Sequence, residues 1–222
     1  MDKKLFAQAV SKFLLGAIAV GLLIFIPGGL AYKQGWIFMA ILFLPMFAAG
    51  LVMLKKSPEL LRKRLSAKEK RGAQQTVVKL SGLMFLAGFI LAGLDHRFGW
   101  LPLPMWLSIA AAVLFLAAYA LYAEVLRENV YLSRTIEVQE NQKVIDTGLY
   151  GIVRHPMYMA TLLLFLSMPL VLGSLIAFVV FLAYPAIIIG RLKDEEKFLE
   201  AELAGYAEYI KKVKYRLLPF IW

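Results

Sequence analysis

Residues 155–190 read HPMYMATLLLFLSMPLVLGSLIAFVVFLAYPAIIIG, a stretch of 36 residues without Asp, Glu, Lys or Arg. A membrane-spanning helix needs roughly 20 apolar residues, so this stretch is too long for a single crossing. Pro169 and Gly173 lie near its middle, where such residues favour a break between helices. The stretch therefore predicts two antiparallel helices, at about 158–171 and 174–191, that form a hairpin either spanning the membrane or re-entering it.

Four other stretches without charged side chains precede the hairpin. The whole chain has 222 residues, of which 61% are hydrophobic and 18% charged, whereas soluble domains have roughly half and a quarter. We therefore expect an all-α integral membrane protein with four transmembrane helices, a C-terminal helical hairpin and a cytoplasmic amphipathic helix. The expected spans are residues 13–32, 34–54, 80–94 and 98–123, within a first region, 1–122; a second region, 123–222, contains the hairpin at 157–191 and the C-terminal helix.

The positive charges are distributed unevenly between the two ends of the expected helices. Of the 25 Lys and Arg residues, all but Lys33 and Arg97 fall in segments on one side. The positive-inside rule then places both termini in the cytoplasm, with the polar C-terminal region on the same side. The cluster between Lys55 and Arg71 suits anionic lipid headgroups, so membrane lipids rather than nucleic acid are the expected partner of the net charge of +10.

Polar and aromatic side chains concentrate on both sides of the hairpin. The entrance contains Arg154, His155 and Tyr158, and the exit contains Arg191, Glu195 and Glu196. Because the arms of a hairpin are neighbours, both groups should line one polar pocket at the lipid boundary. Carboxylates accept hydrogen bonds from ammonium and hydroxyl groups, and cations bind carboxylates, so this set suits a zwitterionic ligand. The residues alone predict a polar interfacial site for a charged ligand, and no more.

The segment after the hairpin has helical periodicity. Apolar residues recur at Leu199, Leu203, Tyr206, Ile210 and Val213. This spacing predicts one helix that lies along the membrane interface or packs over the hairpin.

The C-terminal half resembles the isoprenylcysteine carboxyl methyltransferase family, and the half that this family shares with membrane phospholipid methyltransferases. The resemblance covers about Glu124 to Trp222 and rests on an ordered set of motifs. They are the run from Arg134 to Tyr158 with Arg-His-Pro-x-Tyr, the pair Glu195-Glu196, Tyr206-x-x-Tyr209, and Arg216-Leu-Leu-Pro219. One departure is Ala204-Gly205, where many relatives have Phe-Gly.

The resemblance implies S-adenosyl-L-methionine as cofactor, held between the hairpin and the C-terminal helix. The implied cofactor contacts are Gln142, Lys143, Val144, Gly148, Tyr150, His155, Tyr158 and Glu196. Arg154 and Arg216 match positions suited to a substrate carboxylate, and Glu195 completes the implied catalytic set. His96 and His155 are expected on opposite sides of the membrane, so we expect no metal site.

The expected function is methyl transfer to a lipid-like amphiphile, with carboxyl O-methylation of a prenylated, isoprenylcysteine-type substrate as the first choice. A phospholipid amine N-methyltransferase is the alternative, because an amine nucleophile needs only a proton acceptor such as Glu195. An NADPH-dependent sterol-type reductase looks similar in its C-terminal half but usually has more spans. A non-catalytic transporter or scaffold is the remaining class; ion-coupled transport favours ionisable groups at mid-membrane, and the charge-free stretches contain none.

Overall fold

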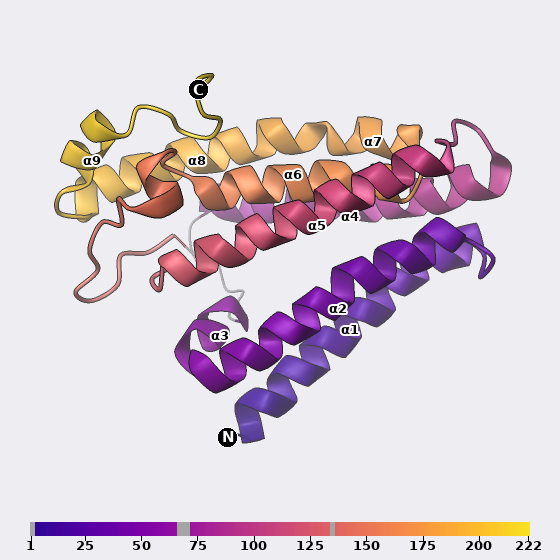
Figure 1. The fold of residues 1–222 in the computed structure, drawn as a ribbon, viewed down its shortest axis with the longest axis horizontal. Helices are drawn as coiled ribbons and strands as arrows, with labels where there is room; N and C mark the ends of the chain where they lie inside the picture. The colour runs from indigo at the N-terminus through magenta and orange to yellow at the C-terminus, as the bar shows by residue number, and fades with distance from the viewer. Residues whose placement is uncertain (1–2, 66–71, 134–135) are drawn as a thin grey trace.

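The chain folds into a bundle of helices (Figure 1). The computed structural model describes residues 3–65, 72–133 and 136–222, and no strand occurs within them. Outside the described residues lie Arg134 of the motif run and three members of the basic cluster, Lys68, Lys70 and Arg71. The helices are α1 (Lys3–Gly28), α2 (Lys33–Lys56), α3 (Pro58–Leu65), α4 (Gly72–Phe98), α5 (Met105–Glu128), the 3-10 turn η1 (Gly148–Gly151), α6 (Pro156–Val171), α7 (Leu175–Phe181), α8 (Ala183–Glu202) and α9 (Tyr206–Lys212).

Within the described residues, five helical segments are long and apolar enough to cross a membrane: α1, α2, most of α4, α5 and the combined α7–α8. The helix α6 is shorter, with 16 residues, and equally apolar. The expected all-helical fold is therefore confirmed, with five helical segments among the described residues that could span a membrane.

The predicted hairpin is present, formed by α6 and the combined α7–α8. Its turn uses Gly173, whose φ of +74° is a conformation that favours glycine, and Ser174, whose hydroxyl accepts from the Ala177 amide at 3.1 Å. The turn packs on the α4–α5 connection, since Leu103 N donates to Gly173 O at 2.8 Å. The hairpin therefore runs the length of its neighbours α4 and α5, and does not turn back half way (Figure 1).

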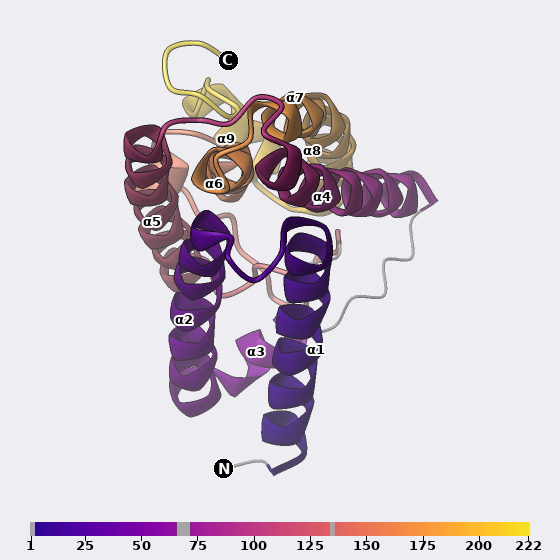
Figure 2. The same ribbon diagram turned by 90° about the vertical axis from the view of Figure 1, so that its right-hand side faces the viewer.

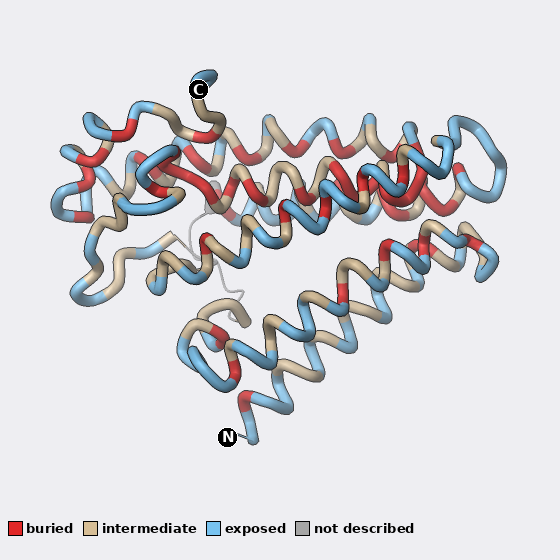
Figure 3. The backbone as a smooth tube through the Cα atoms, viewed as in Figure 1, coloured by how far each residue is buried: buried red, intermediate tan, exposed pale blue. Residues whose placement is uncertain are grey.

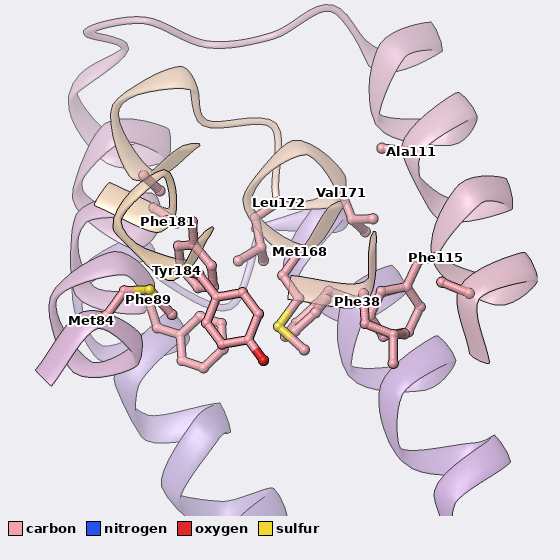
Figure 4. Close-up of a cluster of buried hydrophobic side chains, with 14 of the residues drawn as sticks. Phe38, Met84, Phe89, Ala111, Phe115, Met168, Val171, Leu172, Phe181 and Tyr184 are labelled. Atoms are coloured by element: carbon pink, nitrogen blue, oxygen red, sulfur yellow. The ribbon is translucent and has the colours of Figure 1, made fainter. Parts of the chain in front are cut away.

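The core lies between the hairpin and the inner faces of α2, α4 and α5. The tube in Figure 3 has many buried positions in the hairpin and fewer in α1 and α2. The Phe38 ring centroid lies 5.6 Å from that of Phe89 and 6.1 Å from that of Phe115, so three helices meet at one aromatic cluster (Figure 4). Phe181 of α7 joins this cluster, with its ring centroid 6.0 Å from that of Phe89, so packing of the rings holds the hairpin against α4.

The helices α1 and α2 form a pair that is inclined to the rest of the bundle, and α3 lies between their ends (Figure 2). The α1–α2 connection reaches the hairpin turn through Tyr32, whose hydroxyl donates to Leu172 O. The basic ends of α1 and α2 therefore point to the opposite end of the bundle, where α8 ends and α9 begins (Figure 1).

The predicted boundaries after the hairpin were wrong in two respects. The second arm does not end at residue 191 but continues to Glu202, and the single helix expected across Leu199–Val213 is broken. The backbone of Leu203 is extended and ends α8, and Gly205, with φ +85° in the left-handed region, directs the chain into α9. Periodicity alone missed the break because Leu203 and Tyr206 are buried on both sides of it.

Candidate functional site

The entrance of the hairpin is joined to the C-terminal segment by main-chain hydrogen bonds. Arg154 N donates to Tyr215 O and His155 N donates to Arg216 O, both at 2.9 Å. Pro156 then starts α6, a position where its missing amide hydrogen costs nothing. The chain thereby places Arg216 beside Arg154 although they lie far apart in sequence.

Glu196 on α8 lies at the centre of the basic side chains. Its carboxylate accepts from Arg154 Nε at 2.6 Å and from Arg216 Nε at 2.8 Å, and it lies 3.3 Å from His155 Nε2. Arg154 also donates through Nη1 to Val213 O at 3.0 Å. The Arg154 and Glu196 side chains are only 6% and 9% exposed, so they form a buried ion pair, to which the partly exposed Arg216 adds a second cation. This cluster ties the hairpin entrance, the hairpin exit and the C-terminal segment together.

The neighbouring carboxylate, Glu195, has different partners. The buried Tyr158 hydroxyl donates to Glu195 Oε2, and Arg191 Nε donates to the same hydroxyl at 3.0 Å. Successive helical residues point about 100° apart, so two adjacent glutamates serve two separate clusters. Glu195, Tyr158 and Arg191 line a pocket, and Glu196 lies behind its wall.

This pocket lies at the mouth of the hairpin and contains about 820 Å³ of empty space, part of it open to solvent. The sequence-predicted residues that line it are Gln142, Lys143, Val144, Tyr150, Arg154, His155, Tyr158 and Glu195. The predicted contacts Gly148, Glu196 and Arg216 are not part of its lining.

One buried polar group in the pocket has no partner. The Tyr206 hydroxyl makes no hydrogen bond, although the residue is only 4% exposed. Burial, together with the carboxylates of Glu196 and Glu195, raises the pKa of Tyr206 far above its usual range, so the hydroxyl remains a hydrogen-bond donor. Since unpaired buried polar groups are costly, this hydroxyl marks the pocket as a place for a polar ligand.

The segment between α5 and α6 covers the pocket. Tyr150 fixes its end, because the Tyr150 hydroxyl accepts from Asn129 Nδ2 at 3.0 Å and its carbonyl accepts from the Tyr209 hydroxyl at 2.8 Å. Gly148 holds the turn, with φ +52°, while the Glu128 carboxylate accepts from Leu149 N at 3.0 Å. Gly148 therefore shapes the cover from outside the pocket.

Gly148→Ala should destabilise the cover by about 1–3 kcal/mol, because the new methyl group would overlap the Glu128 carboxylate and the backbone is left-handed. The measurement is thermal unfolding in detergent. Gly190→Ala on α8 is the control, since a β-carbon there meets no atom within 4 Å. Equal melting temperatures for the two variants would contradict this role of Gly148.

Sequence reasoning missed several residues of the pocket. Asn129, Tyr131 and Glu137 come from the segment before the Arg-His-Pro motif, and Met157 lies between His155 and Tyr158. None has a distinctive spacing in the sequence. Tyr206 and Tyr209 belong to a motif that the sequence identified, yet only the fold shows that both line the pocket.

The site is thus a polar pocket at one end of an apolar helical hairpin. Residues 109–201 match the model of the isoprenylcysteine carboxyl methyltransferase (ICMT) family, which confirms the resemblance over the hairpin and its flanks. The matched range includes Arg154, His155, Glu195 and Glu196.

Two curated relatives of this chain are sterol reductases. The chain is 31% identical over 91 residues to the Delta(14)-sterol reductase TM7SF2 of Mus musculus, a match covering 40% of this chain and 22% of the relative. It is 26% identical over 135 residues to the Delta(14)-sterol reductase of Methylotuvimicrobium alcaliphilum, covering 54% of this chain and 32% of the relative. The chain therefore spans a third or less of the length of these relatives.

Proposed function

We propose that this protein is an S-adenosylmethionine-dependent methyltransferase that acts on a lipid-like amphiphile at the cytoplasmic face of a membrane. The observation behind the proposal is the polar pocket at the hairpin mouth, walled in large part by the stretch that matches the ICMT family and containing an unpartnered, buried Tyr206 hydroxyl. The cytoplasmic assignment follows from the distribution of Lys and Arg.

The pocket's donors and acceptors fit this cofactor, which has an ammonium group, a carboxylate and two ribose hydroxyls. Glu137 and Glu195 supply carboxylate oxygens that accept from ammonium or hydroxyl groups. Lys143 supplies a cation for the cofactor's carboxylate, and Tyr206 supplies a neutral donor. We therefore retain as cofactor contacts the pocket-lining residues Gln142, Lys143, Val144, Tyr150, His155 and Tyr158, and assign Gly148, Glu196 and Arg216 to positioning.

When bound, the cofactor supplies a methyl group on a sulfonium, which is already an activated donor. The protein's task is then to align the acceptor and keep water away, an effect worth up to ~7–11 kcal/mol. Both Arg154 and Arg216 donate through Nε to Glu196, but Arg154 alone of the two also lines the pocket. For a carboxylate acceptor, Arg154 would therefore orient the acceptor through its terminal guanidinium nitrogens. For an amine acceptor, Glu195 would accept the proton. Carboxyl O-methylation of an isoprenylcysteine-type substrate and N-methylation of a phospholipid amine thus use different residues.

The sterol reductase relatives favour a second candidate, an NADPH-dependent reductase. NADPH has three phosphate groups, and a site for it should contain several uncompensated cations. Among the lining cations, Arg154 pairs with Glu196 and Arg191 donates to the Tyr158 hydroxyl beside Glu195, which leaves Lys143 for a phosphate. The carboxylates of Glu137 and Glu195 would repel phosphates. The pocket's charges therefore support a zwitterionic cofactor over NADPH.

Calorimetric titration of the detergent-purified protein with S-adenosylhomocysteine and, separately, with NADPH tests the proposal. We expect saturable binding of S-adenosylhomocysteine and none of NADPH at the same concentrations. The reverse result would establish the reductase candidate. If neither S-adenosylhomocysteine nor NADPH binds, both the methyltransferase proposal and the reductase candidate are excluded.

Tyr206→Phe should weaken S-adenosylhomocysteine binding about tenfold, because the lost hydroxyl has no partner other than a ligand. Its melting temperature without ligand should equal or exceed that of the parent. Tyr209→Phe is the matched control: it removes a hydrogen bond to Tyr150 O and should lower the melting temperature instead. Unchanged ligand affinity in Tyr206→Phe would exclude the hydroxyl as a contact.

A further inference from the structure

The short helix α3 lies at the ends of α1 and α2, toward the end of the bundle at which α9 lies (Figure 1). Its Leu61 is buried against Leu5 of α1 and Leu54 of α2, and Lys12 Nζ donates to Leu65 O at 2.6 Å. The apolar face of α3 is therefore covered by the protein, whereas Glu59 and Arg62 are exposed.

The surface around α3 is strongly basic. Among residues 3–12 and 55–65 the only acidic side chain is Glu59, and it pairs with Arg62 at 3.5 Å. Lys55 and Lys56 at the end of α2 are exposed. The basic side chains of this surface are Lys3, Lys4, Lys12, Lys55, Lys56, Arg62, Lys63 and Arg64. Such a cluster at the end of two membrane helices is complementary to anionic headgroups.

The same helix is hydrogen-bonded to the segment that covers the pocket. Lys63 Nζ donates to Gln139 Oε1 at 2.5 Å, and Arg64 lies over the Tyr122 ring of α5. The Gln139 side chain in turn donates through Nε2 to Tyr131 O at 2.5 Å. The backbone N–H of Gln139 donates to Gln142 Oε1 at 2.9 Å. Since Tyr131 and Gln142 line the pocket, two successive hydrogen bonds connect α3 to the pocket wall.

We propose that α3 and the adjoining ends of α1 and α2 bind anionic phospholipid headgroups, and that this binding orders the pocket cover through Lys63 and Gln139. The clustered cations repel one another, which opposes the close packing of α3 on α1 and α2. Headgroup phosphates relieve this repulsion and hold Lys63 within reach of Gln139. Membrane charge should therefore increase the ligand affinity of the site, a consequence that rests on the function proposed above.

The test places the full chain in nanodiscs of phosphatidylcholine alone or of equal parts phosphatidylcholine and phosphatidylglycerol. Hydrogen–deuterium exchange of residues 136–146 reports on the cover without any ligand, and titration with S-adenosylhomocysteine reports on affinity. We expect slower exchange and at least about fivefold tighter binding in the anionic discs, both reversed by high salt.

Three variants test the headgroup-binding charges, the hydrogen bond between Lys63 and Gln139, and the effect of removing an unrelated lysine. Lys55→Gln combined with Lys56→Gln should reduce both responses to phosphatidylglycerol, and Lys63→Met should abolish the exchange response. Lys33→Gln is the matched control, an exposed lysine at the opposite end of α2, and should respond as the parent does.

The outcomes distinguish this inference from the proposed function. Exchange and affinity that are equal in both kinds of disc, or variants that respond like the parent, would overturn the inference. Exchange that slows in anionic discs without any S-adenosylhomocysteine binding would support the surface and its coupling while removing the methyltransferase proposal.

Discussion

Glu196→Ala should destabilise the protein by about 3–5 kcal/mol, the largest effect expected of any single substitution in the site. The change removes the common acceptor of Arg154 and Arg216 and leaves the Arg154 guanidinium, 6% exposed, without its carboxylate. The C-terminal segment should then detach from the hairpin entrance. Thermal unfolding in detergent measures the loss, and limited proteolysis after residue 213 reports the detachment.

Glu200→Ala provides the control for helix propensity and charge, because Glu200 is exposed on the same helix, α8. Its melting temperature should stay near that of the parent. If Glu196→Ala and Glu200→Ala unfold at the same temperature, the cluster around Glu196 has no structural role.

Glu195→Gln should weaken S-adenosylhomocysteine binding by about 10- to 100-fold while leaving the fold intact. Glutamine keeps an oxygen that can accept from the Tyr158 hydroxyl, so the apo structure loses little. The lost negative charge, however, removes a charge-assisted hydrogen bond to the ligand, worth ~1.5–3 kcal/mol. Calorimetry gives the affinity, and thermal unfolding without ligand shows whether the fold is unchanged.

Substitutions at the adjacent residues Glu195 and Glu196 should thus have different effects. Glu195→Gln should affect ligand affinity alone, whereas Glu196→Ala should affect stability first. A Glu195→Gln variant that binds as tightly as the parent would place the ligand elsewhere in the pocket.

The sequence predicted the hairpin because hydrophobic length and a central glycine are local properties. It also brought the entrance and exit residues together, since antiparallel arms are neighbours. The resemblance implied a catalytic role for Glu195 and a cofactor contact for Glu196, but it did not predict that only Glu195 lines the pocket. The direction of each side chain depends on the rotation of α8 about its axis. That rotation is set by packing, with Ile188 and Leu192 buried on the core side.

The cover and the C-terminal segment were harder to predict. Asn129 and Tyr131 reach the pocket only because the Tyr150 hydroxyl and carbonyl fix the cover, a long-range arrangement without sequence periodicity. The break at Gly205 depends on a left-handed backbone that a helical pattern does not reveal.

Methyl transfer itself is the most direct test of the central proposal. The protein in proteoliposomes would receive S-adenosylmethionine with a tritiated methyl group, together with a prenylated cysteine or phosphatidylethanolamine. We expect radioactivity in the lipid extract. The label should be base-labile if the acceptor is a carboxylate and base-stable if it is an amine. Glu195→Gln should strongly reduce the labelling. A lipid extract without label from either acceptor, with NADPH consumed instead in the presence of an unsaturated sterol, would contradict the central proposal.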